Sequence, residues 1–249
     1  MARQASKPAA ARPKGRVKPS AAPAATATAA KLAAPAPAPA ASHKRDSAAT
    51  RQRILEAGSK EFAEHGFSGA RIDQIAKAAQ SNVQMIYRYF GSKEELYLAV
   101  LEDTYARVRN RERELKLASY EPAEGFRRLV EFTFDFLIED PAFVAIIRNE
   151  NVAGGRFVKM SNSVPVSTLP LLEEIIDLLR RGRASGVFKR EVDPAQIYVT
   201  ILALCFTHLS NQHTLSAMFQ RDVSDEAWLA ERREHAVRVV LSYLTSGEV

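Results

Sequence analysis

The segment from Arg71 to Leu96 constrains the fold more than any other, because it places three helix signals within one short stretch. Its first part carries apolar residues at the i, i+3, i+4, i+7 spacing of one helical face, namely Ile72, Ile75, Ala76 and Ala79. Asn82 is a favourable N-cap for a second helix over residues 83–90, which Gly91 ends. Ser92 is then the N-cap of a third helix. The segment therefore predicts two short helices joined by a tight turn and followed by a third helix.

The same kinds of signal predict helices along most of the chain after residue 45. The expected helices cover about residues 47–65, 92–119, 122–139, 141–151, 166–184, 194–219 and 225–245. Gly66 is expected to end the first of these in the left-handed C′ position. The highly charged stretch at 107–116 predicts a solvated connector between two bodies. Since no stretch alternates apolar and polar residues with period two, the predicted fold class is all-α.

Residues 1–45 differ in composition from the rest of the chain. They hold nine of the 35 basic residues and no acidic one, so the basic residues that follow are outnumbered by the 29 acidic ones. Alanine and proline dominate the segment, and Val17 and Leu32 are its only larger aliphatic residues. Such a composition buries too little apolar surface to offset ordering entropy, so we expect a disordered basic tail. A solubilising leader and an organellar transit peptide also fit this composition.

Several classes of function lack their sequence signals. Cys205 is the single cysteine, which excludes an intrachain disulfide and a thiolate metal cluster. No run approaches about 18 consecutive apolar residues, so we expect no membrane span. The chain has no H-E-x-x-H metal motif, no phosphate-binding loop and no G-x-S-x-G nucleophile elbow. The sequence therefore predicts no enzyme, no metal site and no cofactor.

A combination of four motifs lies between residues 50 and 105. These are R-I-L-x-A at 53–57, G-F at 66–67, I-A-x-A-A at 75–79 and I-Y-x-Y-F-x-S-K-E-x-L at 86–96. The combination resembles the DNA-binding domain of the TetR family of bacterial repressors. The resemblance implies a three-helix helix-turn-helix DNA-binding domain at 46–92, after a tail at 1–45. It also implies a larger helical effector-binding and dimerisation domain at 93–249.

The sequence departs from the family pattern at both ends of the second helix. Ala70 and Arg71 stand where a threonine usually opens this helix, so Ser68 or Gly69 is expected to cap it. Gln80 stands where the turn usually has glycine, which is unfavourable if φ is positive there. Arg71 is expected to bind a phosphate as a cation in place of the threonine.

Eight residues are expected to contact DNA, namely Arg71, Asn82, Val83, Gln84, Met85, Tyr87, Arg88 and Lys93. Tyr87 and Lys93 suit phosphates, and Lys93 lies at a helix N-terminus, which also attracts anions. Gln84 has the donors and acceptors to read adenine and Arg88 those to read guanine, although either side chain suits a phosphate equally well. Ile86 and Phe90, which are four residues apart, are expected in the core.

The resemblance implies a dimer surface on the last two helices and an effector pocket among the preceding ones. The candidate dimer residues are Ile201, Leu204, Cys205, His208, Val240 and Tyr243, whose apolar stripes suit an internal core equally well. The candidate pocket residues are Phe132, Phe136, Phe143, Ile147, Arg148 and Asn149. Arg148 or Asn149 is expected to orient a carboxylate, and His208 to be a satisfied buried histidine. The N-E-N at 149–151 and C-F-x-x-x-S-N-x-H at 205–213 resemble regulators linked to catabolism of small aromatic acids.

The sequence therefore favours a sequence-specific transcriptional regulator in the bacterial cytoplasm, associated with the nucleoid. We expect a homodimeric repressor that a small organic effector, an aromatic or carboxylate compound, releases from a double-stranded DNA operator. The alternative left open is a constitutive DNA-binding or nucleoid-associated protein without an effector, in which the basic tail dominates binding. Neither interpretation involves a membrane.

Overall fold

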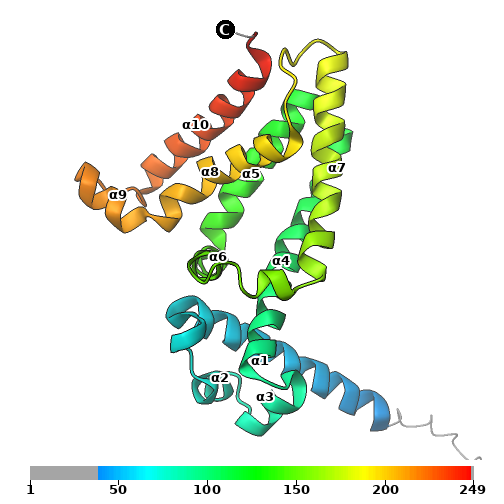
Figure 1. The fold of residues 1–249 in the computed structure, drawn as a ribbon, viewed down its shortest axis with the longest axis vertical. Coiled ribbons are helices and arrows are strands. Elements are labelled where there is room, and N and C mark those ends of the chain that lie inside the picture. Colours follow the sequence, from blue (N-terminus) through cyan, green and yellow to red (C-terminus); the bar gives the residue numbers. More distant parts are fainter. Residues whose placement is uncertain (1–38, 248–249) are drawn as a thin grey trace, which may run out of the picture. The chain divides into compact units, whose positions relative to one another are not determined.

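The computed structural model describes residues 39–247, so the expected disorder of residues 1–38 lies outside the described part. Within this part the chain forms ten α-helices, two short 3-10 helices and no strand, which confirms the all-α fold class (Figure 1). In chain order the elements are α1 (Pro39–Gly69), α2 (Ile72–Ala78), α3 (Val83–Phe90), α4 (Lys93–Glu114), η1 (Leu117–Ser119), α5 (Pro122–Glu139), α6 (Pro141–Val152), η2 (Val158–Met160), α7 (Ser163–Ala184), α8 (Pro194–Ser210), α9 (Gln212–Phe219) and α10 (Glu226–Thr245).

The N-terminal body consists of α1, α2, α3 and the first half of α4, packed around one apolar core. Its helix starts follow from caps: the Asn82 Oδ1 accepts a hydrogen bond from the Met85 amide at 2.8 Å, and the Ser92 Oγ accepts one from Glu95 at 3.1 Å. Gly91, with φ 82°, ends α3. The core does not stop at residue 92, because Ile146 and Phe157, from far along the chain, complete it.

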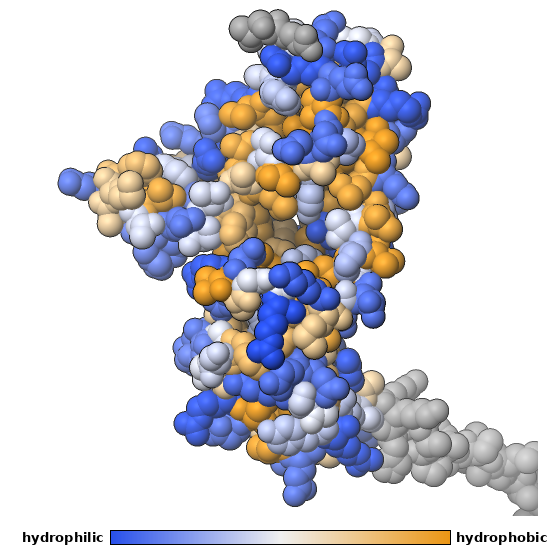
Figure 2. Space-filling view, viewed as in Figure 1, coloured by the Kyte–Doolittle hydropathy of each residue, from blue (hydrophilic) through white to orange (hydrophobic). Residues whose placement is uncertain are grey.

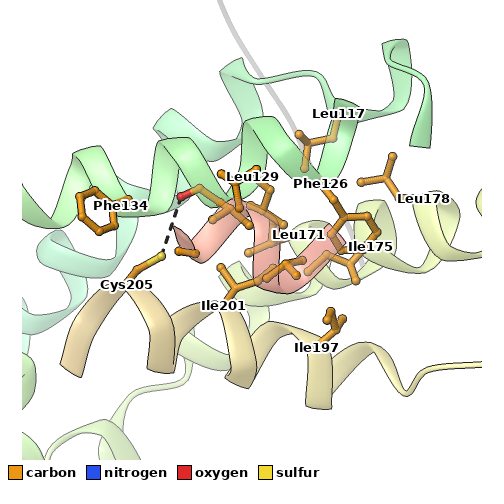
Figure 3. Close-up of a cluster of buried hydrophobic side chains, with 14 of the residues drawn as sticks. Leu117, Phe126, Leu129, Phe134, Leu171, Ile175, Leu178, Ile197, Ile201 and Cys205 are labelled. Carbon is orange, nitrogen blue, oxygen red and sulfur yellow. Dashed lines mark hydrogen bonds between the residues drawn. The ribbon is translucent and has the colours of Figure 1, made fainter. Parts of the chain in front are cut away.

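The C-terminal body surrounds a second core, formed by the second half of α4 with α5, α7, α8 and α10. Figure 3 shows buried side chains of this core, among them Phe126, Leu129, Leu171, Ile175, Ile197 and Ile201. The Cys205 thiol lies among them and donates a hydrogen bond to the Val130 carbonyl, with an Sγ to O distance of 3.8 Å (Figure 3). Gly125 lets α5 approach α7 closely, because a Cβ there would lie 2.5 Å from the Leu178 Cδ2.

Five helix boundaries differ from expectation, one of them the start of α7, which begins at Ser163 rather than at residue 166. The first helix begins at Pro39, so the expected tail boundary at residue 45 falls inside α1. Gly66 does break α1, but with φ 64° and ψ 178° its backbone is extended in ψ rather than left-handed helical. The fourth helix ends at Glu114, and η1 follows it. The expected helix over 194–219 is interrupted at Asn211, where φ is −118° and ψ is 19° and both the backbone amide and the side-chain amide donate to the Thr207 carbonyl.

The charged second half of α4 connects the two bodies as expected, and most of its charged side chains are exposed, but two of them are buried. Arg109 and Glu112 are each 6% exposed and form an ion pair with an N to O distance of 2.6 Å. Arg109 also donates to the Tyr198 hydroxyl of α8 at 2.8 Å. Burial raises the pKa of the Glu112 carboxyl, although the charge of Arg109 opposes this shift. Composition alone does not distinguish this buried pair from the exposed charges on the rest of the stretch.

Candidate nucleic-acid interface and effector site

Helix α3 presents one face to the protein and the other to solvent. Ile86 is fully buried and Phe90 is 7% exposed, which confirms the predicted core positions. On the opposite side Gln84, Arg88 and Tyr87 are exposed, with 46% of Tyr87 accessible. Val83 is 37% exposed at the start of the helix. We call Val83, Gln84, Tyr87 and Arg88 the recognition face, since these side chains of α3 point away from the core.

Two further candidates of α3 lie differently from the recognition face. Asn82 is exposed, but its side-chain oxygen is the helix N-cap, so its first role is to start α3. Met85 is half-buried and lines a hollow together with Ser47 and Thr50 of α1. Part of the Met85 side chain is therefore covered. This leaves less apolar surface exposed for the expected contact with a thymine methyl.

The turn between α2 and α3 holds a glutamine where left-handed backbone is required. Gln80 has φ 50°, one of three positive φ values at non-glycine residues in the described chain. The turn is closed by a hydrogen bond from the Ser81 amide to the Ala76 carbonyl at 2.9 Å. Gln80 was expected to be unfavourable if its φ were positive, and φ is positive here.

The second helix begins without the cap that was expected. Neither Ser68 nor Gly69 is its N-cap; Arg71 is, and its side chain makes no capping bond. Instead the Glu61 carboxylate of α1 accepts the Arg71 amide at 2.9 Å, so a long-range contact does the capping. The Arg71 guanidinium pairs with Asp73 at 3.0 Å on the surface, with 69% of the Arg71 side chain exposed. Because exposed pairs contribute little, a phosphate can replace Asp73 at low cost.

Lys93 lies at the start of α4, where a phosphate contact was expected, but its ammonium group already has protein partners. The Nζ donates to the Ala70 carbonyl at 2.6 Å and lies 5.0 Å from the centre of the Phe67 ring. These contacts hold the entry to α2 against the start of α4. A phosphate contact by Lys93 stays a prediction, and the contact to Ala70 gives the residue a structural role as well.

Residues of α1 make contacts with α3 and with the end of α2 that the sequence did not predict. Ser47 shares a hydrogen bond with the Tyr89 hydroxyl at 3.0 Å, and the Arg51 guanidinium lies 5.0 Å from the Phe90 ring centre. Arg53 donates to the Ala79 carbonyl at 3.3 Å. The two hydrogen bonds, from Ser47 and from Arg53, join residues more than 25 positions apart. In the sequence, the basic side chains near the start of α1 were the only indication of such contacts.

Two polar residues in the last turn of α6, Asn149 and Glu150, bond to other parts of the chain rather than lining a pocket. The Asn149 Nδ2 donates to the last carbonyls of α1 before Gly66, at 3.2 Å to Phe62 and 3.4 Å to Ala63. Glu150 is 2% exposed, and its Oε1 accepts from the amides of Phe157 and Val158 at 2.6 and 2.9 Å. We call residues 146–158 the joint, because they connect α6 to α1.

An aromatic cluster completes the joint. Phe157 is 1% exposed and lies 4.6 Å from Tyr97 and 4.7 Å from Phe67, measured between ring centres. The Arg156 guanidinium lies 4.8 Å from the Phe157 ring centre. Burial, and then the charge of Glu150, raises the pKa of Tyr97, so its hydroxyl stays protonated. The joint is therefore a packed contact between the two bodies and not a loose linker.

The six candidate pocket residues do not share one site, although the rings of Phe132, Phe136 and Phe143 contact one another, with 5.9 Å between the first two ring centres and 5.2 Å between the last two. Phe136 and Phe143 are buried in the C-terminal core, and Phe132 and Ile147 pack against it, so these four are core residues. Asn149 belongs to the joint. Two of the six line hollows, but different ones: Phe136 lines a hollow between α4 and α5, and Arg148 lines one of about 280 Å³ between α5, α6, α8 and α9. Apolar periodicity identified these helices but not which of their faces borders an open space.

Most of the candidate dimer residues are core residues of a single chain. Ile201, Cys205 and Val240 are fully buried, and His208 is 3% exposed, so none of the four is available to a second copy. Leu204 is half-buried, and only Tyr243, at 47%, is well exposed. The apolar stripe of α8 faces α5, and the alternative that these stripes form an internal core is the correct one for these four residues.

His208 is buried but not satisfied, contrary to expectation. Both of its ring nitrogens are buried without a hydrogen-bond partner. The ring stacks on Phe134 with 5.0 Å between centres and 16° between planes. Burial, with the nearby charge of Arg232, lowers the pKa of His208 to about 4. The imidazole is therefore neutral and serves as an aromatic packing element.

The described residues also lack two features. No group of three or more histidine, cysteine or acidic side chains there has the geometry to hold a metal ion. None of the described helices combines the length and apolarity that crossing a membrane requires.

A tight pair of short helices with an exposed recognition face, joined to a larger helical body, defines a helix-turn-helix DNA-binding protein. Comparison with known families agrees with this class. The family described as bacterial regulatory proteins, tetR family, matches residues 54–100, and the tetracyclin repressor-like C-terminal domain matches residues 122–240. The chain belongs to the TetR family and is a DNA-binding transcriptional regulator.

Individual relatives support this assignment to different extents. The HTH-type transcriptional repressor NicS of Pseudomonas putida is 36% identical over 193 residues, which cover 76% of this chain and 91% of that protein. The HTH-type transcriptional repressor SCO4008 of Streptomyces coelicolor is 57% identical over 58 residues, which cover 23% of this chain and 30% of that protein. Among solved structures, the putative transcriptional regulator SCO4942 of Streptomyces coelicolor has a TM-score of 0.59 and 25% identity, covering 78% of this chain and 98% of its own.

Proposed function

We propose that this regulator is a homodimeric repressor that leaves its operator when a small organic effector binds the C-terminal body. The proposal assigns the protein to the bacterial nucleoid, where operator DNA lies. Similarity to the repressor NicS over most of the chain supports the sign of regulation. A hundredfold loss of operator affinity requires only about 2.7 kcal/mol of coupling between the two sites.

The observation that carries the proposal is the joint. Asn149 and Phe157 link α6 directly to α1 and α4 of the N-terminal body, by hydrogen bonds to the α1 carbonyls and by ring contacts with Tyr97. A movement of α6 therefore displaces the helices that support α3. Because a dimer must fit two α3 helices to half-sites about 34 to 36 Å apart, a small change in each chain disfavours binding.

The exposed faces of α8 and α10 are the proposed dimer surface. Val199, at 58% exposure, Ala203 and Thr207 lie along the solvent side of α8, and Tyr243 lies on α10. These small and apolar side chains suit close packing of helices in a four-helix arrangement between subunits. This surface uses the side of α8 opposite to the buried stripe.

Introducing charge on this surface tests the dimer. Val199→Glu is expected to convert the dimer to monomer in sedimentation velocity and to weaken operator binding, because a buried unpaired carboxylate opposes association. Val166→Glu, at a 64% exposed position of α7, is the matched control and should leave the dimer intact. A dimer that survives Val199→Glu places the interface elsewhere.

The regulatory function is tested by selecting fragments of the source genome that the full chain binds. Binding of the selected operator is then measured at raised salt against random DNA, for the wild type, Arg88→Ala and Lys60→Ala. Lys60 is an exposed α1 residue outside the recognition face, so its variant controls for charge alone. We expect specificity to be lost only in Arg88→Ala. Equal binding to operator and random DNA would support the constitutive nucleoid-associated alternative instead.

A further inference from the structure

The hollow between α5, α6, α8 and α9 has the composition of a ligand site. Leu137, Val144 and Leu209 supply apolar wall, and Arg148, Gln212 and His213 supply polar groups. Its volume of about 280 Å³ is close to the lower end of the roughly 300 to 1,000 Å³ typical of small-molecule sites. The hollow therefore suits a small ligand with an apolar body and few polar atoms.

The charge of this hollow has one sign. No acidic residue lines it, and Arg148 makes no ion pair or side-chain hydrogen bond within the part of the chain that the structure describes. The hollow between α4 and α5 differs, because its arginines are neutralised internally: Arg107 pairs with Asp140, and Arg111 with Glu139, each at 2.9 Å. Of these two hollows in the described residues, therefore, only the one lined by Arg148 offers an anion an unpaired guanidinium beside an apolar wall.

We propose that this hollow binds a small organic monoanion whose apolar body lies on Leu137, Val144 and Leu209 and whose carboxylate pairs with Arg148. A planar guanidinium binds a carboxylate through two parallel hydrogen bonds, which gives both affinity and orientation. Gln212 adds a neutral side-chain amide donor. The inference rests on the proposed function for its regulatory meaning, but ligand binding at Arg148 stands on the hollow itself.

The position of Arg148 connects the hollow to the joint. It lies on α6 immediately before Asn149, which bonds to the α1 carbonyls, and Glu150, which holds the amide of Phe157. A ligand that draws Arg148 toward α8 and α9 therefore acts on the same turn of α6 that contacts the N-terminal body. Differential binding of the ligand to the two positions of α6 supplies the coupling.

Calorimetry on the full-length dimer tests the site with benzoate and hexanoate as probes, each compared with its uncharged amide. We expect the carboxylates to bind and the amides to bind at least about tenfold more weakly. Arg148→Met is expected to lose the preference for the carboxylate, whereas Arg180→Met, at an exposed arginine of α7, keeps it. Ala145→Phe fills the hollow without changing its charge and should also abolish binding. Carboxylate binding unchanged in both Arg148→Met and Ala145→Phe overturns the proposal, as does no binding of any probe to the wild type at millimolar concentration.

A second arm separates the site from the regulatory function. Asn149→Leu keeps the hollow but removes the bonds to Phe62 and Ala63, so carboxylate binding should persist while its effect on operator affinity falls. Binding that requires Arg148 but leaves the operator affinity of the wild type unchanged would uphold the site and overturn effector release. Operator release by a probe that does not need Arg148 would uphold effector release and overturn the site.

Discussion

Asn82 offers the sharpest separation of a structural role from a DNA-reading role, because both were expected of one side chain. Its Oδ1 caps α3 by accepting from the Met85 amide at 2.8 Å, while its amide nitrogen remains a donor on an exposed residue. Asn82→Ala removes the cap, which is expected to reduce the free energy of unfolding by about 1 kcal/mol. If helix α3 in each subunit of a dimer is destabilised by this same free energy, the free energy of operator binding falls by about 2 kcal/mol, which is roughly a thirtyfold loss of affinity.

Asn82→Ser is the matched comparison, because serine also caps well but lacks the amide donor. Urea unfolding reports the cap, and fluorescence anisotropy with the selected operator reports the contact. We expect Asn82→Ser to retain both stability and affinity. An affinity loss in Asn82→Ser at wild-type stability would show that the amide itself contacts DNA, and full affinity in Asn82→Ala would refute the link between the cap and recognition.

Two predictions concern buried polar groups and are measured by urea unfolding. The pKa of His208 is about 4 in the folded chain against 6.5 unfolded, so its contribution to stability is complete above pH 6.5 and is lost as pH falls toward 4. His208→Phe keeps the stacked ring, and we expect equal or greater stability with less loss over this pH range; an unchanged pH dependence contradicts the assignment. Glu112→Ala leaves the Arg109 guanidinium buried without its carboxylate and should cost about 3 to 5 kcal/mol. The double variant Arg109→Met, Glu112→Met should recover most of this loss, and no recovery would show that the pair acts through other contacts.

Local signals predicted the N-terminal helices well, because their ends depend on neighbouring residues. The caps at Asn82 and Ser92 and the stop at Gly91 are short-range hydrogen bonds and backbone preferences, and all three are present. The interruption at Asn211 escaped prediction because an apolar pattern continues through it. There, the side-chain amide shares the Thr207 carbonyl with the backbone amide, and the backbone leaves helical geometry, which periodicity does not record.

Long-range contacts account for what the sequence did not predict. Helix α8 carries apolar side chains on its buried side, such as Ile201 and Cys205, and on its exposed side, such as Val199, and periodicity does not say whether a helix of the same chain or of a second copy covers each side. Capping of α2 by Glu61 and the bond from Asn149 to Phe62 join residues 10 and 87 positions apart. Charge and polarity marked these residues as notable, but only the fold shows which partners they meet.

The shared core between Phe157, Tyr97 and Phe67 limits how this regulator can be recombined with others. A chimaera made by joining residues 46–92 to the body of another family member would lose Tyr97, Ile146 and Phe157 and leave a gap against Phe67. Loss of one large buried aromatic side chain typically costs about 3 to 5 kcal/mol, a large part of the stability of a small domain. Engineered sensors should therefore combine the segment from α1 to the middle of α4 with residues 146–158 of the same protein. The DNA-binding body then keeps the residues that complete its core.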